Sequence, residues 1–140
     1  MQPLLTQLLD LPGMDVEDYS DLGRELVLEV EARTTKVTCP RCGNDSTHLH
    51  QNHWHLVRDL SMSQHSVLLK LNRRQFKCHV CQKPFSETFE FIGERRRHTD
   101  RFAQMIVQQV IHSDLHNVAK QNDLTDEEVA SIVQYLSKKK

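Results

Sequence analysis

The stretch "CPRCGNDSTHLHQNHWH" (residues 39–55) contains two cysteines and four histidines, and a second cysteine pair follows in "CHVC" (residues 78–81). A C-x-x-C turn can present two thiolates to one metal ion, and two such turns complete a closed four-thiolate zinc site. The 35 residues between the pairs exceed the usual finger spacing, but they suit a zinc ribbon with two strands between its turns. We therefore predict one structural Zn²⁺ bound by Cys39, Cys42, Cys78 and Cys81.

A site of two cysteines and two histidines is the alternative. Twelve residues separate Cys42 from His55, which matches the first half of such a finger. The second histidine would then lie at 59–61, where the chain has Asp-Leu-Ser. We therefore expect the histidines to be neighbours of the metal, with replacement of one cysteine by a histidine as the remaining possibility; they are His48, His50, His53 and His55.

The length of 140 residues allows one domain or two small ones. No apolar run approaches the roughly 20 residues that a membrane span needs. The N-terminal stretch lacks the basic start of a secretory signal. We expect a cytoplasmic protein without a membrane partner, and in a reducing cytosol cysteines are more often metal ligands than disulfides.

Charge is segregated along the chain, although the net charge is only −1. Residues 1–31 carry one Arg against eight acidic residues, whereas residues 32–83 carry nine Lys/Arg against two. The cysteine-bearing segment is therefore the basic one, where a polyanion would bind. A merely solvated basic surface is the alternative.

Apolar residues with a period of two predict strands at 25–32 and 65–78, and a less regular one is expected at 47–60. A short amphipathic helix is expected at 3–10, before the turn at Pro12-Gly13. These segments predict three antiparallel strands bracketed by the cysteine turns, in a zinc-ribbon-like unit.

Helical spacing begins after Thr99, the expected N-cap of a first helix. A second short helix begins at Ser113 or Asp114, and a third has a capping box formed by Thr125 and Glu128. Asp123 suits the left-handed conformation of a tight turn between them. The fold class is thus α+β: 1–22 as helix and turn, 23–90 as zinc-ribbon-like β domain, and 91–140 as a three-helix helix-turn-helix bundle.

From residue 4 to residue 137 the chain resembles the N-terminal part of transposases of the ISL-three family of insertion sequences. The resemblance rests on "LPG", "CPRC", "VRDL", a basic strand running into "CHVC", and "PFSE", in that order. It implies the same four zinc ligands, and a zinc module and helix-turn-helix that bind double-stranded DNA at the terminal inverted repeats of the element.

The resemblance also implies which side chains face the DNA. They are Arg73, Arg74 and Lys77 on the basic strand, Arg95, Arg96 and Arg97 after it, and Arg101 as a further candidate. Family members continue into a long catalytic domain with an acidic triad, for which 140 residues leave no room. We therefore expect a recognition module of a transposase that is not itself an enzyme.

One departure from the family favours a different function. The third helix begins with Asp126, Glu127 and Glu128, which would repel phosphates if this helix entered a DNA groove. The alternative is a protein-interaction module or transposition inhibitor, which would pair with its own copy (a homo-oligomer) or with a full-length transposase through the apolar face of residues 102–111. An enzyme is disfavoured, because Asp59, Asp100 and Asp114 form no recognisable catalytic constellation.

Overall fold

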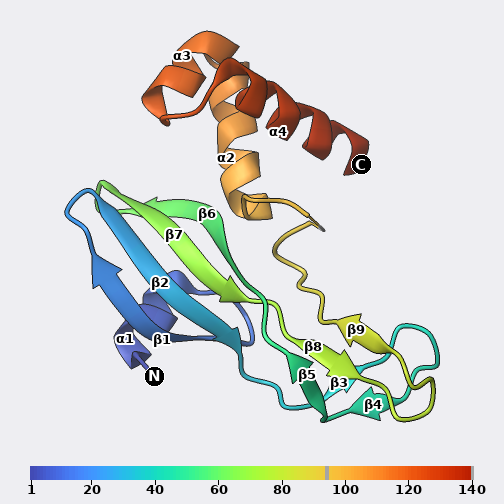
Figure 1. The fold of residues 1–140 in the computed structure, drawn as a ribbon. Coiled ribbons are helices and arrows are strands. Elements are labelled where there is room, and N and C mark those ends of the chain that lie inside the picture. Colours follow the sequence, from blue (N-terminus) through green and yellow to red (C-terminus); the bar gives the residue numbers. More distant parts are fainter. Residues whose placement is uncertain (94, 140) are drawn as a thin grey trace.

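A computed structural model describes residues 1–93 and 95–139 and has the predicted α+β class (Figure 1). Its elements are α1 (Pro3–Leu9), β1 (Met14–Asp21), β2 (Glu25–Ala32), β3 (Val37–Thr38), β4 (Asp45–Ser46), β5 (Leu49–Gln51), β6 (Trp54–Met62), β7 (His65–Asn72), β8 (Gln75–Lys77), β9 (Pro84–Ser86), α2 (Asp100–Ile111), α3 (Leu115–Gln121) and α4 (Asp126–Lys139). No helix among the described residues combines the length and apolar character that crossing a membrane requires.

The main sheet has the strand order β1-β2-β7-β6. Its core face carries Leu28 and Val30 from β2 and Val67, Leu69 and Leu71 from β7, all fully buried, as the period-two pattern predicts. Helix α1 covers this face through Leu9, which belongs to the same buried cluster. The apolar alternation therefore identified the buried side of both strands correctly.

The expectation of three antiparallel strands was wrong. The main sheet has four strands, and its central pair, β2 and β7, is parallel. The strand expected at 47–60 divides into β5 and β6, and the one at 65–78 divides into β7 and β8. Both divisions have the same cause, because β6 and β7 pair in the main sheet while β5 and β8 pair in a smaller one.

Residues 1–22 also contain a strand, β1, where the sequence predicted only a helix and a turn. After Val16 every residue of β1 is exposed, so it carries no continuing apolar alternation. Pairing with β2 defines this strand, from Met14 opposite Ala32 to Asp21 opposite Leu26. The division expected between residues 22 and 23 falls in the turn of this hairpin. The two expected domain boundaries, between residues 22 and 23 and between residues 90 and 91, stay predictions.

The cysteine-bearing part lies at one end of the main sheet and consists of two small sheets (Figure 1). One pairs β3 with β4, and the other has the order β5-β8-β9. We call residues 35–51 and 75–86 the zinc unit, since β6 and β7 between them belong to the main sheet. Its buried cluster contains only Phe76, Phe85 and two of the cysteines, with Val37 and Cys81 packed beside it.

Helices α2, α3 and α4 form a bundle, and with α1 they make four helices in the described residues. The bundle buries seven apolar or small side chains in one cluster: Phe102, Ala103, Ile106, Val118, Ala119, Val129 and Ile132. Thr99 caps α2 by accepting from the Phe102 N–H, and Asp114 caps α3. Both halves of the Thr125–Glu128 capping box are present, and Asp123 is left-handed with φ 54°. These local predictions are confirmed.

A buried ion pair joins the bundle to the sheet and to α1. Asp59 on β6 is 1% exposed and accepts from Arg101 Nε at 2.8 Å. It also accepts from the Thr99 hydroxyl at 2.7 Å, and Arg101 donates onward to the carbonyl of Leu9. On the other face of β6, Arg58 donates to the carbonyl of Asn122 and lies over the ring of Phe102.

Candidate metal centre and nucleic-acid interface

The two cysteine turns are built alike. The Gly43 N–H donates to the carbonyl of Cys39, and the Gln82 N–H donates to the carbonyl of Cys78, each at 2.9 Å. Both donors are left-handed, with φ 75° and 60°. Glycine adopts this conformation without cost, whereas glutamine is held in it by the surrounding turn. Each turn therefore folds back on its first cysteine and directs two thiols to the same side.

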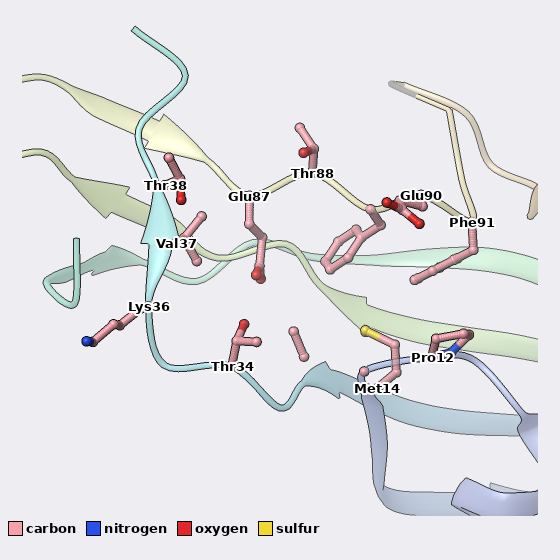
Figure 2. Close-up of a pocket in the computed structure, with 13 residues that line it drawn as sticks. Pro12, Met14, Thr34, Lys36, Val37, Thr38, Glu87, Thr88, Glu90 and Phe91 are labelled. Atoms are coloured by element: carbon pink, nitrogen blue, oxygen red, sulfur yellow. The ribbon is translucent and has the colours of Figure 1, made fainter. Parts of the chain in front are cut away.

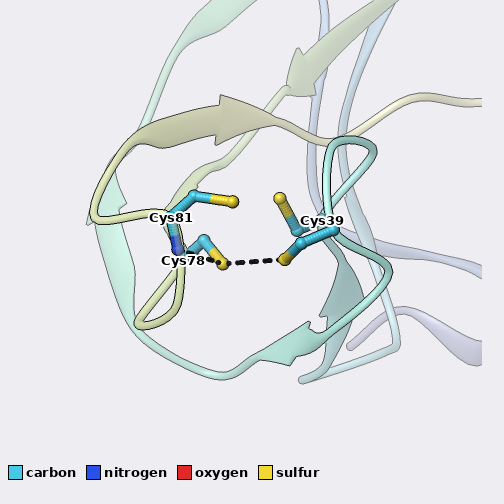
Figure 3. Close-up of side chains that lie close together, drawn as sticks. Cys39, Cys78 and Cys81 are labelled. Atoms are coloured by element: carbon cyan, nitrogen blue, oxygen red, sulfur yellow. Dashed lines mark hydrogen bonds between the residues drawn. The ribbon is translucent and has the colours of Figure 1, made fainter.

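The four cysteine Sγ atoms all lie within 4.8 Å of one another (Figure 3). Tetrahedral Zn–S bonds of about 2.3 Å place ligand sulfurs about 3.8 Å apart. The separation of 3.4 Å between Cys42 and Cys78 is close to that value. Four thiolates leave no open coordination position, so the arrangement fits one structural zinc ion.

Among the described residues, no histidine belongs to this group of possible ligands. His48 and His79 lie near it as an edge-to-face pair, with ring centroids 5.8 Å apart. Of the four histidines in residues 39–55, His48 belongs to this pair, and His55 lies on β6 in the main sheet.

The thiols of the cluster differ in how readily they ionise. Donation from the backbone N–H and side-chain amide of Asn44 lowers the pKa of Cys42 to about 6. Hydrogen bonding with Cys42, then burial, raises the pKa of Cys81 to about 12. The four sulfurs therefore cannot all ionise readily by themselves, and a divalent metal ion supplies the charge that lets them do so.

Two of the predicted DNA contacts are held in ion pairs with buried carboxylates. Arg74 forms a two-bond pair with Glu87, with Nε–Oε1 at 2.9 Å and Nη2–Oε2 at 3.0 Å, and its side chain is 14% exposed. Arg101 is held by Asp59, whose hydrogen bonds raise the pKa of Arg101. Both guanidinium groups are used in holding the fold together.

Four other predicted arginines, Arg73 and Arg95–Arg97, line a single groove of about 770 Å³. Trp54, His55, Leu56 and Ser86 complete its lining, and we call it the arginine groove. The loop that carries Arg95–Arg97 is fixed against β6, because the Arg58 N–H donates to the carbonyl of Arg97. No acidic side chain among the described residues lines this groove. Lys77 lies outside it, half-buried on β8.

The arginine run also faces the acidic start of α4. A second hollow of about 430 Å³ is lined by Arg95–His98 on one side and by Thr125, Glu127, Glu128 and Ser131 on the other. Glu128 is occupied by the capping box, and Asp126 lies 3.2 Å from His116 Nδ1. The acids therefore stand next to a row of cations, which offsets the repulsion that the sequence alone predicted.

Trp54 is the residue of this surface that the sequence reasoning missed. It is the only tryptophan of the chain and lies in its basic segment. That position could have marked it as a candidate, but only the structure shows that it lies beside Arg73 and the arginine run.

A different cavity, of about 360 Å³, lies where the main sheet meets the zinc unit (Figure 2). Pro12 and Met14 line it from the sheet side, and Val37 and Phe91 from the other segments. Its buried carboxylate, Glu87, is already paired with Arg74. This lining therefore offers no buried charge that would select a ligand.

Comparison with known proteins gives three matches. Residues 35–81 match the family described as zinc-finger of transposase IS204/IS1001/IS1096/IS1165, and residues 87–137 match the helix-turn-helix domain of transposase family ISL3, the ISL-three family named above. The chain is 31% identical over 105 residues to the transposase for insertion sequence element IS1001 of Bordetella parapertussis. That alignment covers 75% of this chain and 26% of the transposase. No solved structure matches the chain.

Proposed function

Because the chain carries the zinc-ribbon and helix-turn-helix regions of ISL3-family transposases, we propose that it binds double-stranded DNA at the terminal inverted repeats of an insertion sequence. It would act as the recognition part of the transposase, in the cytoplasm, without contributing catalytic groups of its own. The zinc ion would hold the fold of the zinc unit and take no part in chemistry.

The arginine groove is the observation that carries this proposal. It gathers Arg73, which follows the basic strand, with the run at 95–97, and no acidic side chain lies among its described lining residues. Cations held in one groove can pair with successive phosphates and release the counterions condensed on DNA. Arg74 and Arg101 are already paired with Glu87 and Asp59, so the contacts that we propose are Arg73, Arg95, Arg96 and Arg97.

Helix α4 is the proposed source of sequence readout. In a helix-turn-helix the second helix of the motif enters the major groove. Ser131 and Gln134 are exposed on α4 about one turn beyond the acidic residues. Both side chains can hydrogen-bond to base edges.

The test is fluorescence anisotropy of the zinc-loaded chain on a duplex carrying the terminal repeat and on a shuffled duplex, at several salt concentrations. We expect tighter binding to the repeat and a steep loss of affinity with salt. The variant Arg73→Ala/Arg97→Ala should reduce the slope of log affinity against log salt concentration by about two. Each lost phosphate contact should account for roughly one unit of that slope.

Arg33→Ala is the matched control, since Arg33 is exposed and lies outside the groove, paired with Asp15. If the control flattens the salt dependence as much as the groove variant does, the groove is not the phosphate-binding surface. Equal affinity for both duplexes would contradict recognition of the repeat.

A second candidate function is pairing with another protein. Ile111 is 64% exposed beside a hollow between α2 and α4, of about 360 Å³, which Val107, Val133 and Leu136 also line. This apolar surface suits a copy of the chain or a full-length transposase. Sedimentation of the free chain tests it: a mass that rises with concentration and returns to the monomer value in Ile111→Ser supports pairing.

A further inference from the structure

Trp54 is unusually placed for a tryptophan. It is 40% exposed at the start of β6, and Leu56, two residues further along the same strand, is 54% exposed. Residues two apart on a strand lie on the same face, so the two side chains form one apolar strip. Tryptophan is highly buried on average, and an exposed one that lies next to a second exposed apolar side chain indicates an interaction site.

This strip lies within the arginine groove. The groove volume of about 770 Å³ falls within the range of roughly 300–1,000 Å³ that small-ligand sites occupy. A further cation stands at the ring, since Lys70 Nζ lies 5.4 Å from the Trp54 ring centroid. The groove thus combines the exposed side chains of Trp54 and Leu56, which we call its floor, with the cations of four arginines.

Binding of duplex phosphates accounts for the cations but not for the floor. The indole N–H can donate to a phosphate, but its apolar ring faces give phosphates and water no favourable contact, and the bases of an intact duplex are already stacked on each other. An unpaired base has free π-faces, and its phosphate is available to nearby arginines. The combination of Trp54 with Arg73 and the arginine run therefore suits a nucleotide that is not base-paired.

We propose that the floor of the arginine groove stacks an unpaired base on Trp54 while the surrounding arginines bind the adjoining phosphates. The partner is a short single-stranded DNA segment, such as an extension at the end of a duplex. The proposal rests on the proposed function, because it assigns to the same DNA-binding surface a preference for an unpaired end.

The experiment compares three labelled duplexes of one sequence: blunt, with a three-nucleotide single-stranded extension, and with an extension of the same length without bases. Anisotropy gives the affinity of the zinc-loaded chain for each. We expect the extension with bases to bind about tenfold more tightly than the blunt end, since stacking of one base accounts for that factor. The abasic extension should give little advantage. Fluorescence of Trp54, the sole tryptophan, should be quenched by the extension with bases.

Trp54→Leu should lose the tenfold advantage of the extension over the blunt duplex, whereas Trp54→Phe should retain most of it. Tyr19→Leu, at another exposed aromatic position, is the matched control and should change neither. Blunt-duplex affinity and zinc content report whether Trp54→Leu is folded. If Trp54→Leu is not folded, Trp54→Phe and the abasic extension still test whether a base stacks on the ring.

The proposal is overturned if the abasic extension binds as well as the one with bases, or if Trp54→Leu keeps the advantage. Failure of the wild type to prefer the repeat sequence would contradict end recognition and leave this preference standing.

Discussion

The zinc unit and the helical bundle are both small, yet they are held together in different ways. The bundle buries seven side chains in one cluster, with six further hydrophobic residues packed around it. The zinc unit buries two phenylalanines and two cysteines, and its strands have only two or three residues each. A unit with so little apolar burial requires a metal for stability, whereas the bundle is stabilised by its hydrophobic core.

Removing the metal should break this comparison most strongly. Cys78→Ser, or a strong chelator, removes a binding free energy of about 10 kcal/mol or more that is coupled to folding of the zinc unit. We expect the amide NMR signals of residues 35–51 and 75–86 to lose dispersion while those of the main sheet and of α2–α4 are kept. His79→Ala is the control, because His79 is adjacent in sequence but is not one of the clustered ligands. Unchanged signals for β8 after zinc removal would show that the unit folds without metal.

Asp59→Ala tests the joint between the sheet and the bundle. The change leaves Arg101 and the Thr99 hydroxyl without their acceptor, so unfolding free energy should fall by about 4 kcal/mol. Urea denaturation measures this. Asp15→Ala removes the more exposed pair with Arg33 and should cost about 1 kcal/mol or less. Equal losses for the two variants would mean that the buried pair does not stabilise the joint.

Ile132→Ala addresses the bundle core. Ile132 is fully buried on α4, so the variant should lose about 3 kcal/mol through lost burial and a cavity. Zinc content should not change, because the zinc unit has a separate core. Ile111→Ala removes the same atoms at an exposed position on α2 and should cost far less. Loss of zinc in Ile132→Ala would show that the two regions do not fold separately.

Thr125→Ala sharpens the comparison at the level of a single cap. The substitution removes the hydroxyl that accepts from the Glu128 N–H at the start of α4, at a cost of about 1 kcal/mol. Thermal unfolding followed by circular dichroism detects the shift. Ser131→Ala, an exposed hydroxyl further along α4, is the control and should be close to neutral. If the two variants have the same stability, the capping box does not contribute.

His98→Phe should have the smallest effect, and it depends on pH. Burial, followed by the charge of Arg96, lowers the pKa of His98 in the folded chain. The unfolded state therefore binds more protons, so this contribution is present above pH about 6.5 and is lost as the pH falls below that value. Phenylalanine keeps the stacking on Phe102 but does not titrate.

The measurement for His98→Phe is the difference in urea midpoint between pH 7.5 and pH 5.0. That difference should be smaller in the variant than in the wild type. His50→Phe, at an exposed position, serves as the control for a change of ring type. An identical pH difference in wild type and His98→Phe would rule out a contribution from this histidine.

Two of the motifs that carry the family resemblance each contain an acidic residue that is buried in an ion pair. Asp59 of "VRDL" and Glu87 of "PFSE" are the buried partners of Arg101 and Arg74. Arg101 and Arg74 neutralise these buried carboxylates, since an unpaired buried charge is strongly destabilising.

The sequence alone determined the features that depend on short spacing. The two C-x-x-C turns predicted the four clustered thiols, and the caps at Thr99 and Thr125 predicted where helices begin. The apolar alternation predicted the buried faces of β2 and β7. Each turn, cap and strand period is decided within a few residues, although folding must still bring the two cysteine turns together.

Only the tertiary structure decided which distant segments meet. It paired β2 with β7 in parallel, and it separated Arg74, which is paired with Glu87, from its neighbour Arg73 in the groove. It also placed Trp54 beside the arginine run. Such outcomes depend on the neighbours that folding brings together across tens of residues, because a side chain's charge and exposure are set by those neighbours and not by its own type.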